Sequence, residues 1–267
     1  MKFRYTAGFV GAGNMGGALA AAACKAAAPA QVIVSCRTAA HAQAVAAQLG
    51  CDWGTAADAV KQSRFIFLGV KPQMLDAVAQ ELAEAFREAN GVLVSMLAGV
   101  SLARLESLFG KERKILRIMP NTPCAVGSGM ILLCKNDAAA AADADAFCAL
   151  MAQAGRVDML PERLIDAGSA VTGCGPAFVY MFIQALADGG VECGLPRAQA
   201  QQYAEQLVLG SAQLALQTGK HPEQLKDEVC SPGGSTIAGV HALEEQAFRS
   251  ACMNAVTAAW RRTTQLG

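Results

Sequence analysis

The stretch from Tyr5 to Gly16 limits what this chain can fold into more than any other part of the sequence. Strand-type apolar residues up to Val10 lead directly into Gly11-Ala12-Gly13-Asn14-Met15-Gly16, and an alanine-rich stretch with high helix propensity follows. This order of strand, glycine turn and helix is the context that the dinucleotide fingerprint G-x-G-x-x-G requires. Free N–H groups at the start of the helix favour a phosphate. The sequence therefore predicts a nucleotide site, the alternative being a structural glycine turn.

Composition narrows the class of protein. Of the 267 residues, 53% are apolar and 16% charged, a globular composition that favours a large buried surface such as a subunit interface. The 22 basic and 22 acidic residues balance, and no basic run interleaves with aromatics, which argues against a nucleic-acid partner. We find no apolar run of about 18 residues and no signal peptide, so we expect a cytoplasmic protein without a membrane partner.

Cysteine usage bears on metals and disulfides. The chain has ten cysteines and three histidines, and no C-x-x-C pair occurs among them. The spacing of a zinc site is therefore absent, and we expect no metal. We expect the cysteines to be reduced and to serve as small apolar residues.

Strand-type and helix-type segments alternate along residues 1–161. Continuous apolar runs such as Phe65–Val70 are typical of central parallel strands. Helical stretches and short loops separate these runs, and the alternation predicts an α/β fold with a doubly wound, Rossmann-type sheet. The predicted strands cover residues 5–10, 31–34, 65–70, 92–97, 115–119, 130–133 and 155–159.

Ligands of such a sheet lie outside the carboxyl ends of its strands. Four of those ends carry unusual residues here, and because the loops converge we expect them to form one cofactor site. Lys71 has an equally good explanation as a solvated charge at a helix start. The residues predicted on this ground are Val10, Gly11, Ala12, Gly13, Asn14, Met15, Ser35, Arg37, Gly69, Val70, Lys71, Pro72 and Asn121.

The residues after the second predicted strand indicate which nicotinamide binds. An acid at this position would bind the ribose hydroxyls and repel a 2′-phosphate, but the chain has no acid before Asp52. It offers Ser35, Arg37 and Thr38, a cluster suited to a phosphate dianion. We therefore expect NADPH as the cofactor; the alternative is that Arg37 is a surface charge and NADH also binds.

From Pro161 onward helical periodicity dominates, so we predict a dinucleotide-binding domain over residues 1–161 and a helical domain over 162–267. Gly173 to Pro176 should kink an early helix. Arg197–Gln217 is apolar almost all round, which favours burial against another subunit. Ser231-Pro232-Gly233-Gly234 precedes a helix that starts near Thr236, where backbone donors are free; an ordinary helix cap is the alternative explanation.

With these motifs placed, the chain resembles pyrroline-5-carboxylate reductase over nearly its whole length. The most specific matches are Leu225-Lys226-Asp227 and the run from Ser231 to Thr236. Further matches are Val70-Lys71-Pro72, Ala98-Gly99-Val100, Met119-Pro120-Asn121-Thr122-Pro123, Gly173-Cys174-Gly175-Pro176-Ala177, Ala187-Asp188-Gly189-Gly190, Gly194-Leu195-Pro196-Arg197 and His221-Pro222. One departure is Ala56, near which some members have an asparagine that touches the adenosine ribose.

The resemblance implies reduction of the cyclic imine Δ1-pyrroline-5-carboxylate to L-proline by NAD(P)H. It implies a helical domain that dimerises, dimers that assemble into decamers, and a substrate pocket at the dimer interface. Glu162, Ser235 and Thr236 match the family's substrate site. Beyond the residues predicted above, Met96, Leu97 and Ala98 match its cofactor site.

The chemistry asks little of an acid residue if the imine arrives protonated, because hydride then goes to the carbon of the C=N bond. The Thr236 hydroxyl is the candidate catalytic group, as a hydrogen-bond partner of the ring nitrogen. Backbone donors from Gly233 and Gly234 to Thr236 are candidates for holding the carboxylate. Two alternatives are a β-hydroxyacid dehydrogenase, for which the expected lysine after Gly175 is missing, and a non-catalytic NADP-binding regulator.

Overall fold

A computed structural model describes residues 3–265 of the chain, which divide into two compact units. The first runs from the amino-terminal strand to Gly173 and takes up the end of the last helix from Trp260. The second is Cys174–Ala259. Each unit is described by itself below.

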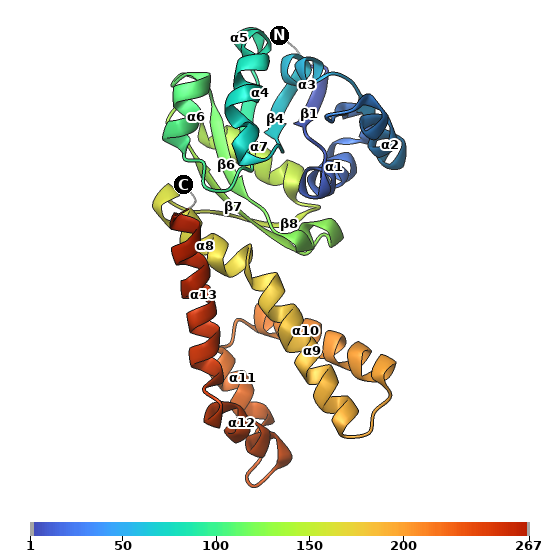
Figure 1. Ribbon diagram of the computed structural model, residues 1–267, viewed down its shortest axis with the longest axis vertical. Helices are drawn as coiled ribbons and strands as arrows, with labels where there is room; N and C mark the ends of the chain where they lie inside the picture. Colours follow the sequence, from blue (N-terminus) through green and yellow to red (C-terminus); the bar gives the residue numbers. More distant parts are fainter. Residues whose placement is uncertain (1–2, 266–267) are drawn as a thin grey trace. The chain divides into compact units, whose positions relative to one another are not determined.

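The first unit is built on an eight-stranded sheet in the order β3-β2-β1-β4-β5-β6-β7-β8 (Figure 1). All neighbours are parallel except β6 and β7, so the carboxyl ends of β1 to β6 meet at one edge. This is the doubly wound arrangement that the sequence predicts. The strands are β1 Tyr5–Val10, β2 Val32–Ser35, β3 Asp52–Trp53, β4 Ser63–Leu68, β5 Val92–Ser95, β6 Ile115–Met119, β7 Gly129–Lys135 and β8 Gly155–Met159.

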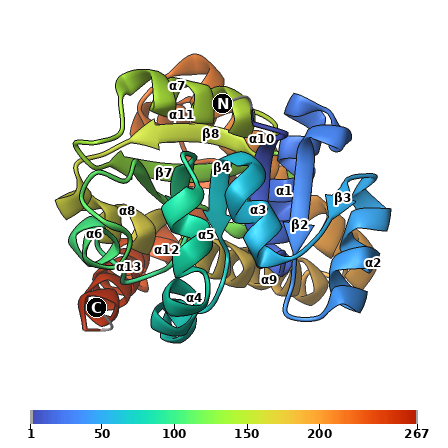
Figure 2. The same cartoon turned by 90° about the horizontal axis from the view of Figure 1, so that it is seen from above.

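Helices cover both faces of the sheet (Figure 2). Residues of α1 and α7 share one apolar core with Phe9 and Phe67, whose rings stack with centroids 4.3 Å apart. Residues of α3 to α6 and α8 share the other core with Leu93. The helices are α1 Asn14–Ala27, α2 Ala39–Leu49, α3 Ala56–Gln62, α4 Leu75–Glu81, α5 Ala83–Glu88, α6 Leu102–Phe109, α7 Ala141–Met151 and α8 Glu162–Thr172.

Several boundaries differ from the sequence prediction. The two-residue strand β3 and the helix α3 were not predicted, and the helix expected to run to about Ala89 is broken at Leu82 into α4 and α5. The strand expected over 92–97 ends at Ser95, so Met96 and Leu97 belong to the following loop. The predicted cap is confirmed: Ser101 accepts a hydrogen bond from the Arg104 N–H at the start of α6 (3.2 Å).

The second unit is helical, with α9 Gly175–Glu192, α10 Arg197–Thr218, α11 Pro222–Val229, α12 Ser235–Glu245 and the first part of α13 Phe248–Thr264. Helices α9 and α10 pack through a small cluster centred on Ala187, Ala200 and Ala204. Large apolar side chains are left exposed in the single chain, among them Tyr180, Met181, Tyr203, Leu207, Leu209, Leu214, Leu216 and Met253. Helix α10 is therefore not buried by its own chain.

The break predicted near Gly173 is present: α8 ends at Thr172 and α9 begins at Gly175. Taken together, Glu162–Glu192 has a mean hydropathy of 1.4 in its most apolar window, and among residues 3–265 it is the one helical stretch long and apolar enough to cross a membrane by length and composition. The sequence contains no uninterrupted apolar run of this length. Glycine, serine and threonine interrupt the apolar residues of Glu162–Glu192, but they add no charge, so the mean hydropathy stays high.

Candidate active site

A cavity of about 630 Å³ opens at the carboxyl edge of the sheet in the first unit. Its walls come from the segments that follow β1, β2, β3 and β4, as the doubly wound fold requires. The volume lies in the range of small-molecule and cofactor pockets. The lining residues are Val10, Gly11, Ser35, Cys36, Arg37, Ala39, Trp53, Gly54, Thr55, Ala56, Asp58, Val70, Met74, Val78, Glu81 and Leu82.

Backbone hydrogen bonds tie these loops together. The Gly11 N–H donates to the Ser35 carbonyl (2.9 Å), and the Gly69 N–H donates to the Val10 carbonyl (2.9 Å). Gly11 has a φ of +96°, in the region that favours glycine. A Cβ on Gly69 would lie 2.3 Å from the Gly11 carbonyl oxygen, so no side chain fits between the two loops. The close approach of these loops therefore depends on glycine at both positions.

The start of α1 fits a phosphate group. Gly13 is the N-cap residue, and no side chain in the described part of the chain caps this helix end. A Cβ on Gly13 would meet no described protein atom within 4 Å, so the space in front of this backbone is open. By contrast, a Cβ on Gly16 would lie 2.3 Å from the Gly11 carbonyl oxygen. The second glycine of the motif thus leaves room for a ligand, and the third lets the helix pack on the turn.

The residues after β2 divide between a buried and an exposed group. Ser35 is only 2% exposed, and its hydroxyl donates to the Phe9 carbonyl (3.0 Å). Its side chain thus holds β2 to β1, although the residue lines the cavity. Arg37 is exposed, and its guanidinium forms no hydrogen bond or ion pair with any residue from 3 to 265. Thr38 caps α2 by accepting from the His41 N–H (3.4 Å).

The other predicted cofactor residues lie along the same edge with different exposures. Val70 lines the cavity, while the adjacent Lys71 and Pro72 are exposed at the start of a 3-10 turn, Pro72–Met74. Leu97 is buried, so it has only backbone groups to offer, and Ala98 is exposed. Met96 is half-buried. Ala12 is buried, and Asn14 and Met15 form the first turn of α1.

Asn121 is committed to protein partners. Its side-chain N–H donates to the Thr172 carbonyl at the end of α8 (2.9 Å), and its side-chain oxygen accepts from the Met130 N–H (2.8 Å). The amide thereby joins the loop after β6 to α8 and β7. Its role as a cofactor contact stays a prediction, and the structure gives it a structural task.

Glu162 belongs to a charged cluster in the first unit. Its Oε1 accepts from Arg117 (3.0 Å) and from the Leu102 N–H at the start of α6 (2.7 Å). Arg117 is 3% exposed and also pairs with Asp166 (3.0 Å). Burial of this arginine requires such partners. The predicted role of Glu162 in binding substrate is untested by these contacts, which show it joining β6, α6 and α8.

The Ser231–Gly234 turn lies in the second unit and leads into α12. The Gly234 N–H donates to the Ser231 carbonyl (3.0 Å), and Gly233 has a φ of +67°. Gly234 is the N-cap of α12, which no side chain within residues 3–265 caps. Thr236 is exposed in the first turn of α12. The turn thus presents uncapped backbone donors beside a free hydroxyl, as predicted.

A cavity of about 560 Å³ borders the two glycines of this turn. It is also lined by Lys226, His241 and Glu244, and not by Ser235 or Thr236. Thr236 therefore does not line this cavity.

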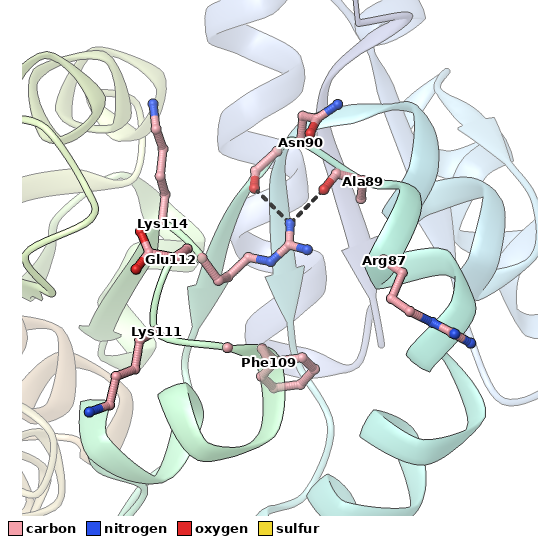
Figure 3. Close-up of a pocket in the computed structure, with 10 residues that line it drawn as sticks. Arg87, Ala89, Asn90, Phe109, Lys111, Glu112 and Lys114 are labelled. Atoms are coloured by element: carbon pink, nitrogen blue, oxygen red, sulfur yellow. Dashed lines mark hydrogen bonds between the residues drawn. The ribbon is translucent and has the colours of Figure 1, made fainter.

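A further cavity, of about 430 Å³, lies before β5 and β6, at the amino ends of the strands (Figure 3). It has basic side chains, but Arg87, Lys111 and Lys114 point away from one another (Figure 3). Arg113 donates to the Ala89 carbonyl just beyond α5 (2.7 Å), and burial lowers the pKa of its guanidinium. The cavity thus surrounds Arg113, which binds the backbone just beyond the end of α5. Its other basic side chains do not converge on a common point where a ligand could bind.

The part of the 630 Å³ cavity that is formed by β3 and the start of α3 was not predicted from the sequence. Trp53, Thr55 and Asp58 lie there because β3 adds an unpredicted edge strand, beside Ala56, which the sequence had marked only as a departure from the family. A signal was present: Thr55 and Asp58 form a reciprocal capping box at the start of α3. The Asp58 carboxylate accepts hydrogen bonds from the Thr55 hydroxyl and N–H, and these bonds lower the pKa of the carboxyl.

Two family models match the chain. Residues 6–99 match the model described as NADP oxidoreductase coenzyme F420-dependent. Residues 162–266 match the model described as pyrroline-5-carboxylate reductase dimerisation. The second match begins where the helical domain is predicted to begin, whereas the division into compact units falls after Gly173.

Curated relatives and solved structures agree with the family models. The pyrroline-5-carboxylate reductase of Pisum sativum is 40% identical over 98% of this chain and 96% of its own length. The reductase of Escherichia coli is 38% identical, with 97% of each chain covered. The reductase structure from Coxiella burnetii has a TM-score of 0.92 at 28% identity, covering 99% of both chains. The NADP-bound pyrroline carboxylate reductase of Plasmodium falciparum has a TM-score of 0.85 at 29% identity, with both chains fully covered.

Proposed function

The chain belongs to the pyrroline-5-carboxylate reductase family and reduces Δ1-pyrroline-5-carboxylate to L-proline with a nicotinamide cofactor, and from this premise we propose how its residues divide the task. The first unit binds the cofactor at the carboxyl edge of its sheet. The turn before α12 in the second unit binds the imine. The bound dinucleotide supplies the hydride for the C=N carbon, and the chain's own groups bind and orient the two reactants.

The pyrophosphate of the cofactor binds at the start of α1. The open space over Gly13, the uncapped helix end and the cavity beside it all support this assignment. Backbone N–H groups at a helix start bind anions, and the helix dipole adds to the attraction. This cradle is the single observation that carries the cofactor half of the proposal.

NADPH is the preferred cofactor. Arg37 is exposed at the rim of the cavity with its charge uncompensated by any neighbour among residues 3–265. A guanidinium is suited to a 2′-phosphate. Two acids, Asp58 and Glu81, also line the cavity, and the Asp58 carboxylate accepts hydrogen bonds from Thr55 in the capping box of α3. Ser35 lines the cofactor site through its backbone, because its hydroxyl donates to the Phe9 carbonyl.

The imine binds at the start of α12. Its carboxylate accepts hydrogen bonds from the uncapped N–H groups of Ser235 and Thr236, which no side chain in the described chain occupies. The ring nitrogen, attached to the carboxylate-bearing carbon, then lies near the Thr236 hydroxyl. This hydroxyl accepts from the protonated iminium and remains a partner of the amine after hydride addition. Glu162 stays a proposed substrate residue because it matches the family's substrate site.

The working form in the cytoplasm is a homodimer through α9 and α10, or a decamer built from such dimers. The exposed apolar side chains of α9 and α10 support the dimer, since such a surface is unusual on a monomer. The same covering accounts for the apolar stretch Glu162–Glu192 without a membrane.

A cofactor-oxidation assay with Δ1-pyrroline-5-carboxylate tests the proposal. The purified chain is supplied with NADPH and, separately, with NADH, and the formation of L-proline is followed beside the loss of absorbance. We expect proline in an equal amount to the cofactor oxidised, with a higher kcat/KM for NADPH. Equal kcat/KM values would contradict the assigned role of Arg37.

A further inference from the structure

Trp53 is an exposed tryptophan at the rim of the cofactor cavity. Its side chain is 47% exposed, although tryptophan is among the most buried residue types on average. It is the last residue of the edge strand β3, and it pairs with Val34 of β2, one residue before Ser35. It lines the cavity together with Arg37.

The neighbours of Trp53 on both sides are held in place. The Asp52 carboxylate accepts from the Tyr5 hydroxyl (2.6 Å), and Thr55 is fixed by the capping box of α3. The Gly54 N–H donates to the Val34 carbonyl (3.2 Å), which anchors the end of β3. The indole is therefore presented from a rigid support, and a preorganised group loses little entropy when a ligand binds.

The position of the indole indicates which part of the cofactor lies against it. A dinucleotide whose pyrophosphate lies at the start of α1 and whose 2′-phosphate lies at Arg37 has its adenine beside the loops that follow β2 and β3. The exposed indole of Trp53 lines this part of the cavity, and Arg37 lines the same cavity. A purine ring stacks on an exposed aromatic face of this kind.

We propose that Trp53 is the platform on which the adenine ring of the cofactor stacks. The inference rests on the proposed nucleotide site and adds a residue to it. Stacking does not sense the ribose phosphate, so Trp53 strengthens the binding of NADPH and NADH alike. Arg37 sets the preference between the two cofactors, and Trp53 sets how tightly the adenosine half is held.

The two tryptophans of the chain make the test specific. A Trp260→Phe variant leaves Trp53 as the single indole, and a Trp53→Phe variant leaves Trp260. Each is titrated with 2′,5′-ADP, which carries the adenine and the 2′-phosphate without the nicotinamide, while tryptophan fluorescence is recorded. We expect quenching in Trp260→Phe and none in Trp53→Phe.

Affinity gives the second readout. Trp53→Ala should raise the Kd for 2′,5′-ADP, NADPH and NADH by about the same factor, roughly tenfold, because one base-stacking contact is lost. Trp53→Phe, which keeps an aromatic face, should restore most of the affinity. Arg37→Ala should weaken 2′,5′-ADP and NADPH but not NADH. Circular dichroism of each variant checks the fold.

The outcomes separate this inference from the proposed function. If the parent chain binds NADPH and reduces the imine, but Trp53→Ala leaves every Kd unchanged and 2′,5′-ADP fails to quench Trp53, then only the stacking proposal is wrong. A parent chain that binds neither 2′,5′-ADP nor NADPH would overturn the nucleotide site itself, and the stacking proposal with it. Loss of NADPH affinity alone in Trp53→Ala would also contradict stacking, because NADH carries the same adenine.

Discussion

Individual residues at the glycine turn do different jobs that the motif G-x-G-x-x-G does not reveal. The three glycines read alike in the sequence. In the structure, Gly11 needs its positive φ, Gly16 needs close contact with the turn, and Gly13 faces open space. The two latter positions make a matched pair for experiment, because each can be changed to alanine.

We expect Gly13→Ala to weaken cofactor binding without unfolding the protein. Its φ of −74° suits any residue, and the added methyl group meets no described protein atom within 4 Å, so it occupies the space of the pyrophosphate. Gly16→Ala should instead lower stability by about 1–3 kcal/mol, because its Cβ overlaps the Gly11 carbonyl. Thermal unfolding and NADPH titration of both variants distinguish the two cases. A large loss of stability in Gly13→Ala would show that this glycine is structural.

Arg37 tests the choice of cofactor. Arg37→Ala should raise the Michaelis constant for NADPH about tenfold or more, since a charge-assisted contact to a phosphate is lost. The constant for NADH should stay nearly unchanged. Lys71→Ala, at another exposed cation of the same edge, serves as the comparison. Equal losses with both cofactors in Arg37→Ala would argue against the 2′-phosphate contact.

Residue types alone could not separate the buried polar groups from the free ones. Ser35 and Arg37 both suggest a phosphate site, yet only register and burial show that the Ser35 hydroxyl bonds the Phe9 carbonyl. Asn121 likewise looks free in the sequence, but the long-range approach of α8 gives its amide a partner. These two contacts join residues 26 and 51 positions apart, beyond the reach of local patterns.

At the scale of elements, the helices on either side of the substrate turn are linked by a charged clamp. Arg249 at the start of α13 pairs with Glu223 of α11 (2.8 Å) and with Glu244 of α12 (2.6 Å). Lys226 adds a second partner to Glu223 (2.6 Å). The turn from Ser231 to Gly234 lies between α11 and α12, and this clamp joins the ends of these two helices that lie away from the turn.

We predict that Arg249→Gln raises the KM for the imine more than it lowers kcat, because the turn loses its fixed spacing while the Thr236 hydroxyl remains. The affinity for NADPH should be unchanged. Arg261→Gln on the same helix α13 is the matched control. Steady-state kinetics at low and high salt measure the effect. The difference in KM between the variant and the parent chain should shrink at high salt, because salt weakens the clamp in the parent chain. A KM that Arg249→Gln leaves at the parent value would contradict the clamp.

The same clamp predicts a pH dependence. Hydrogen bonds from Lys226 and Arg249 lower the pKa of the Glu223 carboxyl to about 2, against 4.5 for a free glutamate. Stability from this pair is therefore present above pH 4.5 and is lost as the pH falls towards 2. The effect is small, because the groups are exposed and screened by solvent. Between pH 4.5 and 2, the melting temperature of Glu223→Gln should fall less steeply than that of the parent chain. Equal slopes would show that Glu223 does not contribute this pH-dependent stability.

Strongly patterned elements could be predicted from the sequence, and weakly patterned ones could not. Continuous apolar runs gave the central strands, and periodic stretches gave the long helices. The edge strand β3 has only two residues, one of them Asp52, and so carries no pattern. The break at Leu82 between α4 and α5 occurs without proline or glycine there, so no local signal marked it. Missing β3 also hid the wall of the cavity that contains Trp53.

At the scale of the whole molecule, the apolar surface of α9 and α10 predicts an obligate dimer. Exposed leucines such as Leu207, Leu214 and Leu216 lie on one helix, and their exposure to water is unfavourable. Sedimentation of the parent chain should show dimers or larger assemblies at all concentrations where it is active. A fully active monomer at low concentration would contradict this expectation.

In the proposed mechanism, the cofactor binds to the first unit and the imine to the turn before α12 in the second. The decisive measurement is the turnover of Thr236→Ala with NADPH and Δ1-pyrroline-5-carboxylate, beside the Kd for NADPH. We predict a fall in kcat of about tenfold or more, with the Kd unchanged, because the partner of the ring nitrogen is lost while the cofactor site is intact. Parent-level turnover and substrate affinity would show that Thr236 is no more than part of a helix start.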